Sequence, residues 1–132
     1  MRRPDWVERL HMIVEAGAAV PFTFGSHDCG RFAARCIDAM TGSDREAELA
    51  RQYANERTAA RFLRREGGIE AAVTARLGDP ITVLEAGRGD VCLIPGEDGP
   101  GLGVCVGATV AVLRPEGIRY APLSAALKAW RV

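Results

Sequence analysis

The first third of the chain spaces its apolar residues with the period of an α-helix. Between Asp5 and Glu15 they recur every three or four positions, which places them on one face. Gly17 and Pro21 then break the pattern. The spacing predicts a first helix over residues 5–15, with this apolar face: Trp6, Val7, Leu10, Ile13 and Val14.

A second amphipathic segment is predicted to begin at Asp28 or Cys29. Its inner face consists of Cys29, Phe32, Ala33, Cys36, Ile37 and Met40. The segment TGSDRE follows, in which Ser43 and Glu46 have the spacing of a capping box, so a third helix is expected there. Residues 58–66 and 69–77 are predicted as two further short helices separated by a Gly-Gly pair.

The pattern changes after the segment LGDPI. Short runs rich in Val, Ile and Leu, bounded by Gly and Pro, predict strands in GDVCLIPG, GLGVCVG, ATVAVLRPEG and GIRYAPL. Residues 124–129 are predicted to add a helical turn. Helices followed by strands indicate an α+β fold. We expect one domain over residues 1–132, with a helical half at about 1–78 and a strand-rich half at about 89–132.

Charge and hydropathy narrow the classes of partner. The 132 residues contain 17 Lys and Arg against 17 Asp and Glu, so the chain has no net positive charge that would favour binding of nucleic acid. No apolar run approaches the roughly 18 residues of a spanning helix, and no membrane insertion is expected. The start, MRRPDWVERL, lacks the apolar core of a signal peptide, so we expect synthesis and folding in a reducing cytoplasm.

Four cysteines are therefore expected to be thiols. Cys29, Cys36, Cys92 and Cys105 form no CxxC pair and have no histidine pair nearby, which argues against a zinc or iron–sulfur site, and no cofactor is expected. Cys92 and Cys105 lie inside apolar strand-like runs and are predicted to be buried structural thiols. Cys29 differs, because the unpaired N–H groups of a helix N-terminus favour a thiolate and can lower its pKa.

The segment around Cys29 resembles a known family. FGSHDCGRFAARCIDAMTG is similar to the nucleophile segment of the NlpC-type cell-wall peptidases, a papain-like group. In those enzymes an aromatic–Gly turn leads to Asp-Cys, a small residue, an apolar helix and a Gly. A second segment, GRGDVCLIPGEDGPGLGVCVG, resembles their Gly-Asp-Val strand and the following strand, which normally opens with His-Val-Gly.

Within this superfamily the chain most resembles small phage tail-assembly proteins. The shared features are an aromatic residue near the N-terminus, short helices with a Gly-Gly pair, and a Trp-Arg ending such as AWRV. The resemblance implies a papain-like NlpC-type domain in which a cysteine-bearing helix packs on a C-terminal antiparallel sheet.

The resemblance assigns roles to individual residues. Cys29 matches the nucleophile, and Asp28 matches the acidic neighbour that fixes the turn or caps the helix. Gly103, Val104 and Gly107 match the strand that carries the family's histidine, but Gly101 stands where that histidine is expected.

No histidine follows Cys29 in the chain, which contains only His11 and His27. His27 lies two residues before the cysteine and is the candidate base, with capping or anchoring of the turn as the alternative role. His11 falls near the edge of the apolar face of the first helix and is expected to be partly buried and structural.

Two functions follow from the resemblance. The first is a structural or assembly protein of a phage or prophage tail tip or hub, with a vestigial Cys29, synthesised in the host cytoplasm and carried in the virion tail. Its partners are other tail tip or hub proteins. The alternative is an active cysteine peptidase or amidase that uses Cys29 to cleave peptidoglycan stem peptides, with a base supplied by His27 or by a partner chain.

Two other features allow more than one interpretation. Trp6 and Trp130 either pack in the core or anchor an interface, and the core is preferred. The segment Pro95–Gly101, PGEDGPG, is either a partner-binding loop at the mouth of the site or a simple strand connection.

Overall fold

The computed structural model describes all 132 residues, Met1–Val132. All the predicted helices are present, and the first helix continues three residues beyond the predicted end at Glu15. Their bounds are α1 Trp6–Ala18, α2 Cys29–Thr41, α3 Arg45–Gln52, α4 Glu56–Glu66 and α5 Ile69–Leu77. The second helix begins at Cys29, as the apolar spacing predicts.

The second half of the chain forms one antiparallel sheet, which makes the fold α+β as predicted. The strands are β1 Val91–Ile94, β2 Gly101–Cys105, β3 Thr109–Arg114, β4 Gly117–Pro122 and β5 Lys128–Trp130. Their order across the sheet is β4-β3-β2-β1-β5. The helical turn predicted over residues 124–129 is wrong in part: a short 3₁₀ turn covers Leu123–Ala125, and β5 then pairs with β1.

The sheet is buried on both faces, which explains the continuous apolar runs in its central strands. On one face Val91, Leu93, Leu102 and Val104 join the main core with α1 and α2. On the other face a second cluster of six residues is covered by connecting segments: Cys92, Ile94, Cys105, Val110, Val112 and Ala129. Cys92 and Cys105 are buried there, as predicted.

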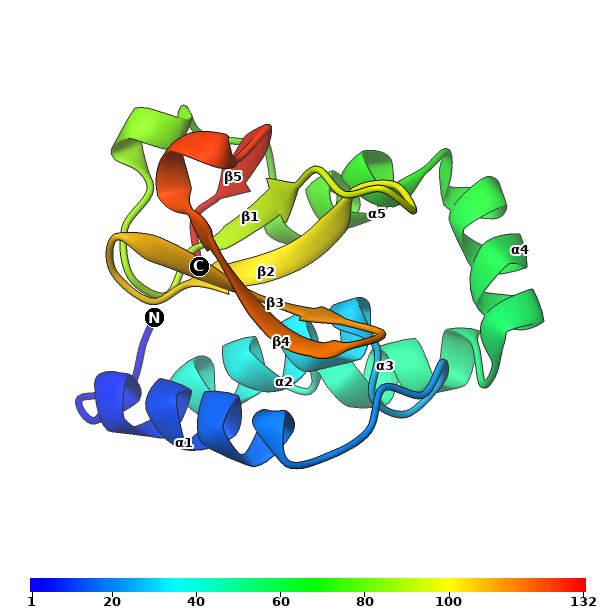
Figure 1. Cartoon of the computed structure of the whole chain (residues 1–132), viewed down its shortest axis with the longest axis horizontal. Coiled ribbons are helices and arrows are strands. Elements are labelled where there is room, and N and C mark those ends of the chain that lie inside the picture. The colour runs from blue at the N-terminus through cyan, green and yellow to red at the C-terminus, as the bar shows by residue number, and fades with distance from the viewer.

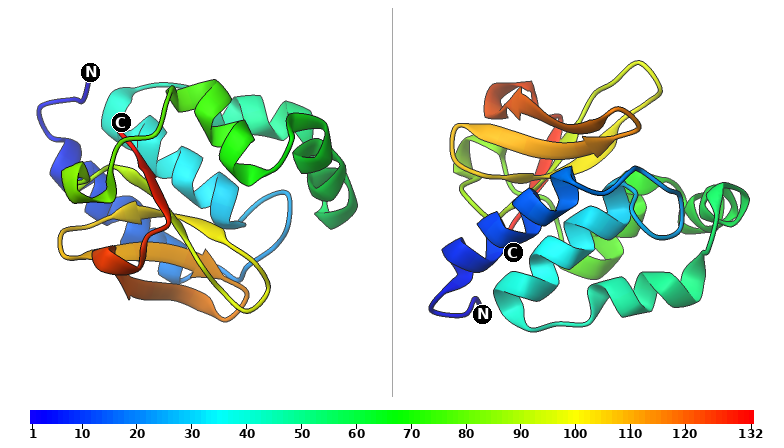
Figure 2. Two further views of the ribbon diagram at one scale, coloured as in Figure 1. Left: turned by 90° about the horizontal axis from the view of Figure 1, so that it is seen from above. Right: turned by 60° about the horizontal axis from the view of Figure 1, so that its bottom comes forward.

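The helices lie on one side of the sheet. Figure 1 shows α1 and α2 next to each other beneath it, with α2 in contact with β2 and β3, and α4 at the end of the molecule farthest from α1. Figure 2 shows the same two layers from above and from below. This arrangement directs the first turn of α2, and with it Cys29, towards the space between the sheet and the helices α3–α5.

Trp130 belongs to the main core, as preferred from the sequence, and Trp6 is partly buried against it. Trp130 is fully buried and donates its Nε1–H to Thr74 Oγ1 at 3.1 Å. Trp6 packs at the edge of the same cluster, with the Arg2 guanidinium 4.3 Å from its ring centroid.

A buried carboxylate joins the two ends of the chain. Asp90 precedes β1, and its Oδ1 accepts hydrogen bonds from Arg2 Nη2 at 2.8 Å and from the Val132 backbone N–H at 3.1 Å. Its Oδ2 accepts from the Gly87 backbone N–H at 3.0 Å. The Gly-Asp-Val segment therefore has a structural role in this chain, because its acid closes the start of the sheet.

The predicted capping box at Ser43 and Glu46 is wrong. The N-cap of α3 is Asp44, which makes no side-chain cap bond. Asp38 of α2 reaches across instead and accepts the Arg45 and Glu46 backbone N–H groups at 2.8 and 3.0 Å. A carboxylate from the preceding helix thus satisfies the unpaired donors that a local side chain was expected to satisfy.

Candidate functional site

A closed turn delivers the chain to Cys29. Thr23 and His27 exchange two backbone hydrogen bonds of 2.8 Å across it. Gly25 has φ +88°, and a Cβ there would lie 2.0 Å from the Ala54 carbonyl oxygen. The aromatic–Gly step thus requires glycine, because the turn packs directly against the backbone that enters α4.

Asp28 is the N-cap of α2 and is almost fully buried. Its Oδ1 accepts the Arg31 backbone N–H at 2.8 Å and the Tyr53 hydroxyl at 2.9 Å, and its Oδ2 accepts the Gly25 backbone N–H at 2.9 Å. Burial, and then the neighbouring Asp28 carboxylate, raise the pKa of Tyr53 well above its usual value. Asp28 therefore holds together the turn, the helix and the segment before α4.

Arg31 completes this buried cluster. Its Nη2 donates to the Tyr53 carbonyl at 2.9 Å, and its guanidinium lies 5.0 Å from the Tyr53 ring centroid. Its Nε is buried with no hydrogen-bond partner. Neither residue was identified from the sequence, because Tyr53 lies 25 positions beyond Asp28 and no local pattern connects them.

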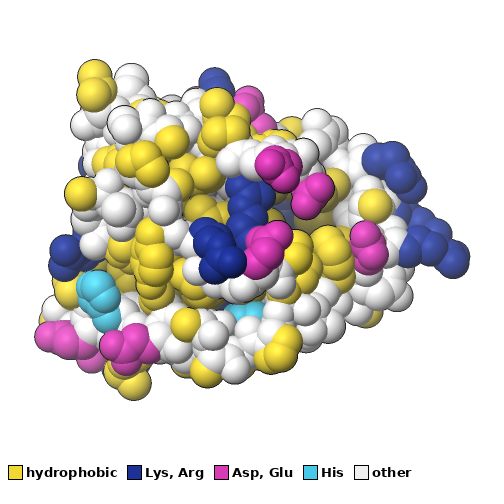
Figure 3. Space-filling model, in the orientation of Figure 1, with side chains coloured by type: hydrophobic (Ala, Val, Ile, Leu, Met, Phe, Trp, Pro, Cys, Tyr) yellow, Lys and Arg dark blue, Asp and Glu magenta, His cyan; other side chains and the backbone are white.

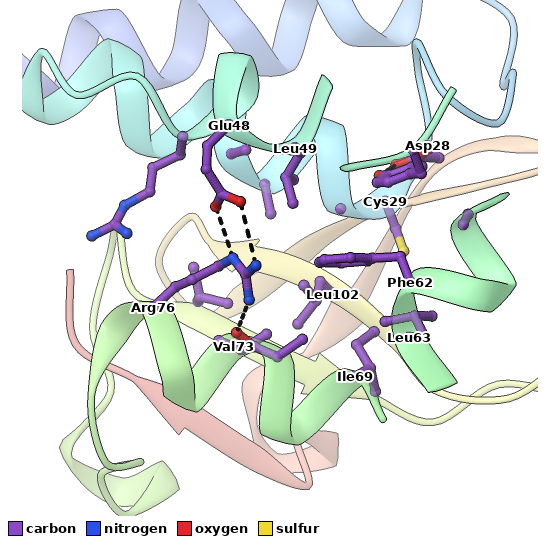
Figure 4. Close-up of a pocket in the computed structure, with 18 of the residues that line it drawn as sticks. Asp28, Cys29, Glu48, Leu49, Phe62, Leu63, Ile69, Val73, Arg76 and Leu102 are labelled. Carbon is purple, nitrogen blue, oxygen red and sulfur yellow. Dashed lines mark hydrogen bonds and ion pairs between the residues drawn. The ribbon is translucent and has the colours of Figure 1, made fainter. Parts of the chain in front are cut away.

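Cys29 is the first residue of α2 and is partly exposed. Figure 4 shows its sulfur directed towards the Phe62 side chain of α4. Burial among apolar groups raises the pKa of the thiol, and the Asp28 charge adds to this effect. The Leu102 and Gly30 backbone amides and the Arg114 guanidinium oppose it but are outweighed. The expected lowering of the pKa by the helix terminus is therefore wrong, because desolvation is the larger effect.

The structure does not bring His27 to the thiol of Cys29. The His27 ring is buried, its Nδ1 lies 3.0 Å from Arg35 Nη1, and its Nε2 lies 2.9 Å from the Gly17 carbonyl oxygen. An arginine can only donate, so Nδ1 is the acceptor and Nε2 carries the hydrogen. Both ring nitrogens are thus engaged in anchoring the turn to α1 and α2, and neither remains for Cys29.

His11 lies on the exposed side of α1, so its predicted partial burial is wrong. Leu10 and Val14 mark the buried face of α1. His11 directly follows Leu10, and because each residue turns the helix by about 100°, its side chain points away from that face.

Gly101, which was predicted from the sequence to match the histidine of the NlpC-type peptidases, opens β2 opposite Ile94. A Cβ at Gly101 would lie 2.8 Å from Arg114 Nη1 and 3.2 Å from Arg114 Cζ. A side chain at Gly101 would therefore meet the guanidinium of Arg114, at the end of β3, on the face of the sheet opposite Leu102 and the helices. Arg114 was not identified from the sequence, since no motif marks it.

Arg114 also holds the connection between β1 and β2. Its Nη2 donates to the Pro95 carbonyl at 3.0 Å and to the Ile94 carbonyl at 3.3 Å, and its Nη1 donates to the Gly99 carbonyl at 3.3 Å. The segment Pro95–Gly101 thus connects β1 to β2 and is tied to β3 by one side chain. The other residues matched to the histidine strand are also structural: Gly103 and Val104 pair with β1, and Gly107 lies in the turn to β3.

A cavity of about 140 Å³ lies beside the Cys29 thiol, and 16 of its 21 lining residues are hydrophobic. It is enclosed by α2, α3, α4, α5 and the first two strands (Figure 4). The labelled apolar side chains around it are Leu49, Phe62, Leu63, Ile69, Val73 and Leu102.

Arg76 of α5 closes the cavity at the side away from Cys29 (Figure 4). Its Nε donates to Glu48 Oε1 at 2.8 Å, and its Nη1 donates to Glu66 Oε1 at 2.6 Å and to the Ala72 carbonyl at 2.9 Å. These hydrogen bonds lower the pKa of Glu48 and raise that of Arg76. One guanidinium therefore links α3, α4 and α5 around the cavity.

Two further thiols, those of Cys36 and Cys92, are predominantly protonated at neutral pH. All four cysteines are free, and burial raises the pKa of both Cys36 and Cys92 to about 12. No group of three or more His, Cys, Asp or Glu side chains is placed to hold a metal ion. None of the helices has both the length and the apolar character needed to cross a bilayer.

Comparison with known proteins identifies the family. Residues 1–132 match the family described as a domain of unknown function (DUF6950), so the chain belongs to that family over its whole length. No curated protein matches it.

Proposed function

We propose that this member of the DUF6950 family is a catalytically inactive NlpC-type, papain-like domain that serves as a structural or assembly protein of a phage tail tip or hub. On this proposal it is synthesised in the host cytoplasm, binds other tail proteins and remains in the virion tail. The observation that carries the proposal is that no histidine follows Cys29 in the chain and that both ring nitrogens of His27 have other partners.

The state of Cys29 supports the absence of catalysis. The nucleophile of a cysteine peptidase is the thiolate, but burial raises the pKa of this thiol and keeps it protonated at neutral pH. Both nitrogens of His27 have other partners, so this chain offers the thiol no general base and the leaving amine no general acid. General acid–base catalysis typically contributes about 10²–10⁴-fold to a rate.

The remaining parts of the architecture are consistent with descent from such an enzyme. A cysteine at the start of a helix faces an antiparallel sheet, and the acid before it caps that helix. In this chain, however, Asp28, His27 and Arg114 each have structural partners. Asp28 and His27, to which the resemblance gives possible roles at the site, thus hold the turn before α2 in place, and the same fold can serve a function other than catalysis.

The proposal is tested by complementation of a phage or prophage from which this gene has been deleted. The deletion is expected to block the assembly of infectious tails, and both the wild-type gene and a Cys29→Ala gene are expected to restore it. Cys36→Ala is the matched control, since it removes a buried thiol from the same helix. The proposal is overturned if Cys29→Ala protein folds and enters the particle but the particles are not infectious.

A further inference from the structure

The cavity beside Cys29 has the size and chemistry to hold one apolar group. Its volume is about 140 Å³, and its wall is formed by side chains such as Leu49, Phe62 and Val73. An apolar protein cavity of about 150 Å³ stays dry when empty and binds benzene. A space of this size therefore accepts one aromatic ring or one branched aliphatic side chain.

Apolar side chains at the rim connect the cavity to the surface. Phe24 lines it and is 41% exposed, with its ring edge-to-face against Phe22 at a centroid distance of 5.0 Å. Leu63 and Ile69 also line it and are partly exposed. An apolar group can thus approach over apolar surface before it is buried.

The helix that supplies Phe62 and Leu63 carries a basic outer face. Arg57, Arg61, Arg64 and Arg65 are exposed on α4, and none of them has a carboxylate within ion-pair distance. Figure 3 shows dark-blue side chains gathered over α4 at the right edge of the molecule. The helix carries these four arginines against two acids, Glu56 and Glu66, and this local excess of positive charge favours acidic residues in whatever lies against α4.

We infer that the cavity receives a single aromatic or branched aliphatic side chain from a partner protein, in a segment whose flanking residues are acidic. The inference rests on the proposed role as an assembly protein, since it names how that domain holds a partner. The apolar group enters beside Cys29, and the flanking carboxylates face the arginines of α4. The cavity beside the thiol thus binds one apolar side chain of the partner.

Three peptides test the inference with the full-length protein: Ac-Glu-Glu-Phe-Glu-Glu-NH₂, its Phe→Ala counterpart, and the Phe peptide flanked by lysines. Binding is followed by NMR shifts of the cavity residues and by the rate at which iodoacetamide alkylates Cys29. The acidic Phe peptide is expected to shift the cavity residues and to slow alkylation. The alanine peptide is expected to bind at least about tenfold more weakly, because it buries no ring, and the lysine-flanked peptide is also expected to bind more weakly.

Two kinds of variant locate the binding. Ala72→Leu fills the cavity and is expected to abolish the protection of Cys29. The surface changes Arg61→Glu and Arg64→Glu leave the core untouched and are expected to weaken binding of the acidic Phe peptide. Arg119→Glu, on the distant strand β4, is the matched charge control and is expected to have no effect.

The inference is overturned by any of three results: equal binding of the Phe and Ala peptides, protection of Cys29 by benzene but by no peptide, or shifts of the cavity residues that depend on protein concentration alone. The last two outcomes would identify a small-molecule site and a contact between copies of this chain. Cleavage of peptidoglycan fragments by the protein would refute the proposed function instead and would not alter these peptide results, so the two failures are distinguishable.

Discussion

At Cys29 two physical effects oppose each other, and burial is the stronger. The helix N-terminus and the nearby amides favour the thiolate, whereas the apolar surroundings favour the neutral thiol and raise its pKa. A helix terminus acts on any cysteine placed there, so this half of the balance can be predicted from the sequence. The apolar surroundings include Phe62 of α4, and no local pattern around Cys29 could indicate that contact.

The raised pKa of Cys29 predicts a slow thiol with a steep pH dependence. Only the thiolate reacts with iodoacetamide, so a pKa above the usual value of about 8.5 leaves less thiolate at every pH below it. Alkylation at pH 7 should be slower than that of free cysteine and should still be rising at pH 9. Intact-mass spectrometry between pH 6 and 10 measures this, with Cys29→Ser as the control. A plateau near neutral pH would show an activated thiolate instead.

Substitutions at Arg114 and Gly101 are predicted to have coupled effects on stability. Arg114→Ala removes the hydrogen bonds to the β1–β2 connection and should lower the free energy of unfolding by about 1–2 kcal/mol. Gly101→Ala should displace the same guanidinium, because the added Cβ would lie 2.8 Å from Nη1. Urea denaturation of both single variants and the double variant measures the coupling.

The double variant should lose less free energy of unfolding than the sum of the losses in Arg114→Ala and Gly101→Ala. Arg119→Ala, an exposed arginine on β4, is the control and should change stability by less than about 0.5 kcal/mol. Strictly additive effects would mean that Arg114 does not depend on the space at Gly101.

Among the elements, those with local signals could be predicted. The apolar spacing located α1 and α2, the three other helices were also expected near their observed positions, and the Gly- and Pro-bounded runs located the first four strands. The fifth strand was missed because Lys128–Trp130 is only three residues long and is defined by its pairing with β1. The cap of α3 was missed for a similar reason, since the carboxylate that caps it belongs to α2.

The observed cap of α3 gives a test at this scale. Asp38→Ala removes an acceptor for the Arg45 and Glu46 backbone N–H groups and should lower the free energy of unfolding by about 1–2 kcal/mol. Ser43→Ala removes only a hydroxyl that donates to Asp38 and should lower the free energy of unfolding by less than Asp38→Ala does. Thermal or urea unfolding of both variants compares them. A larger loss for Ser43→Ala would restore the capping box that the sequence suggested.

For the whole molecule, the order of the elements could be predicted but the use of the site could not. Helices first and strands second predicted the α+β fold, and the resemblance implied a cysteine-bearing helix packed on an antiparallel sheet. The absence of a histidine after Cys29 was also visible in the sequence. The apolar cavity was not, because its wall combines residues from α2, α3, α4, α5 and the sheet, and only the folded chain brings these together. The proposed binding role depends on this assembled feature.

The most direct test of the central claim, that Cys29 performs no hydrolysis, is digestion of purified muropeptides followed by mass spectrometry. Wild-type protein and Cys29→Ala would be compared, with an active peptidoglycan peptidase as the positive control. We predict identical muropeptide profiles for the two proteins and for buffer alone. Cleavage by the wild type that is lost in Cys29→Ala would contradict the account and identify the chain as a working cysteine hydrolase.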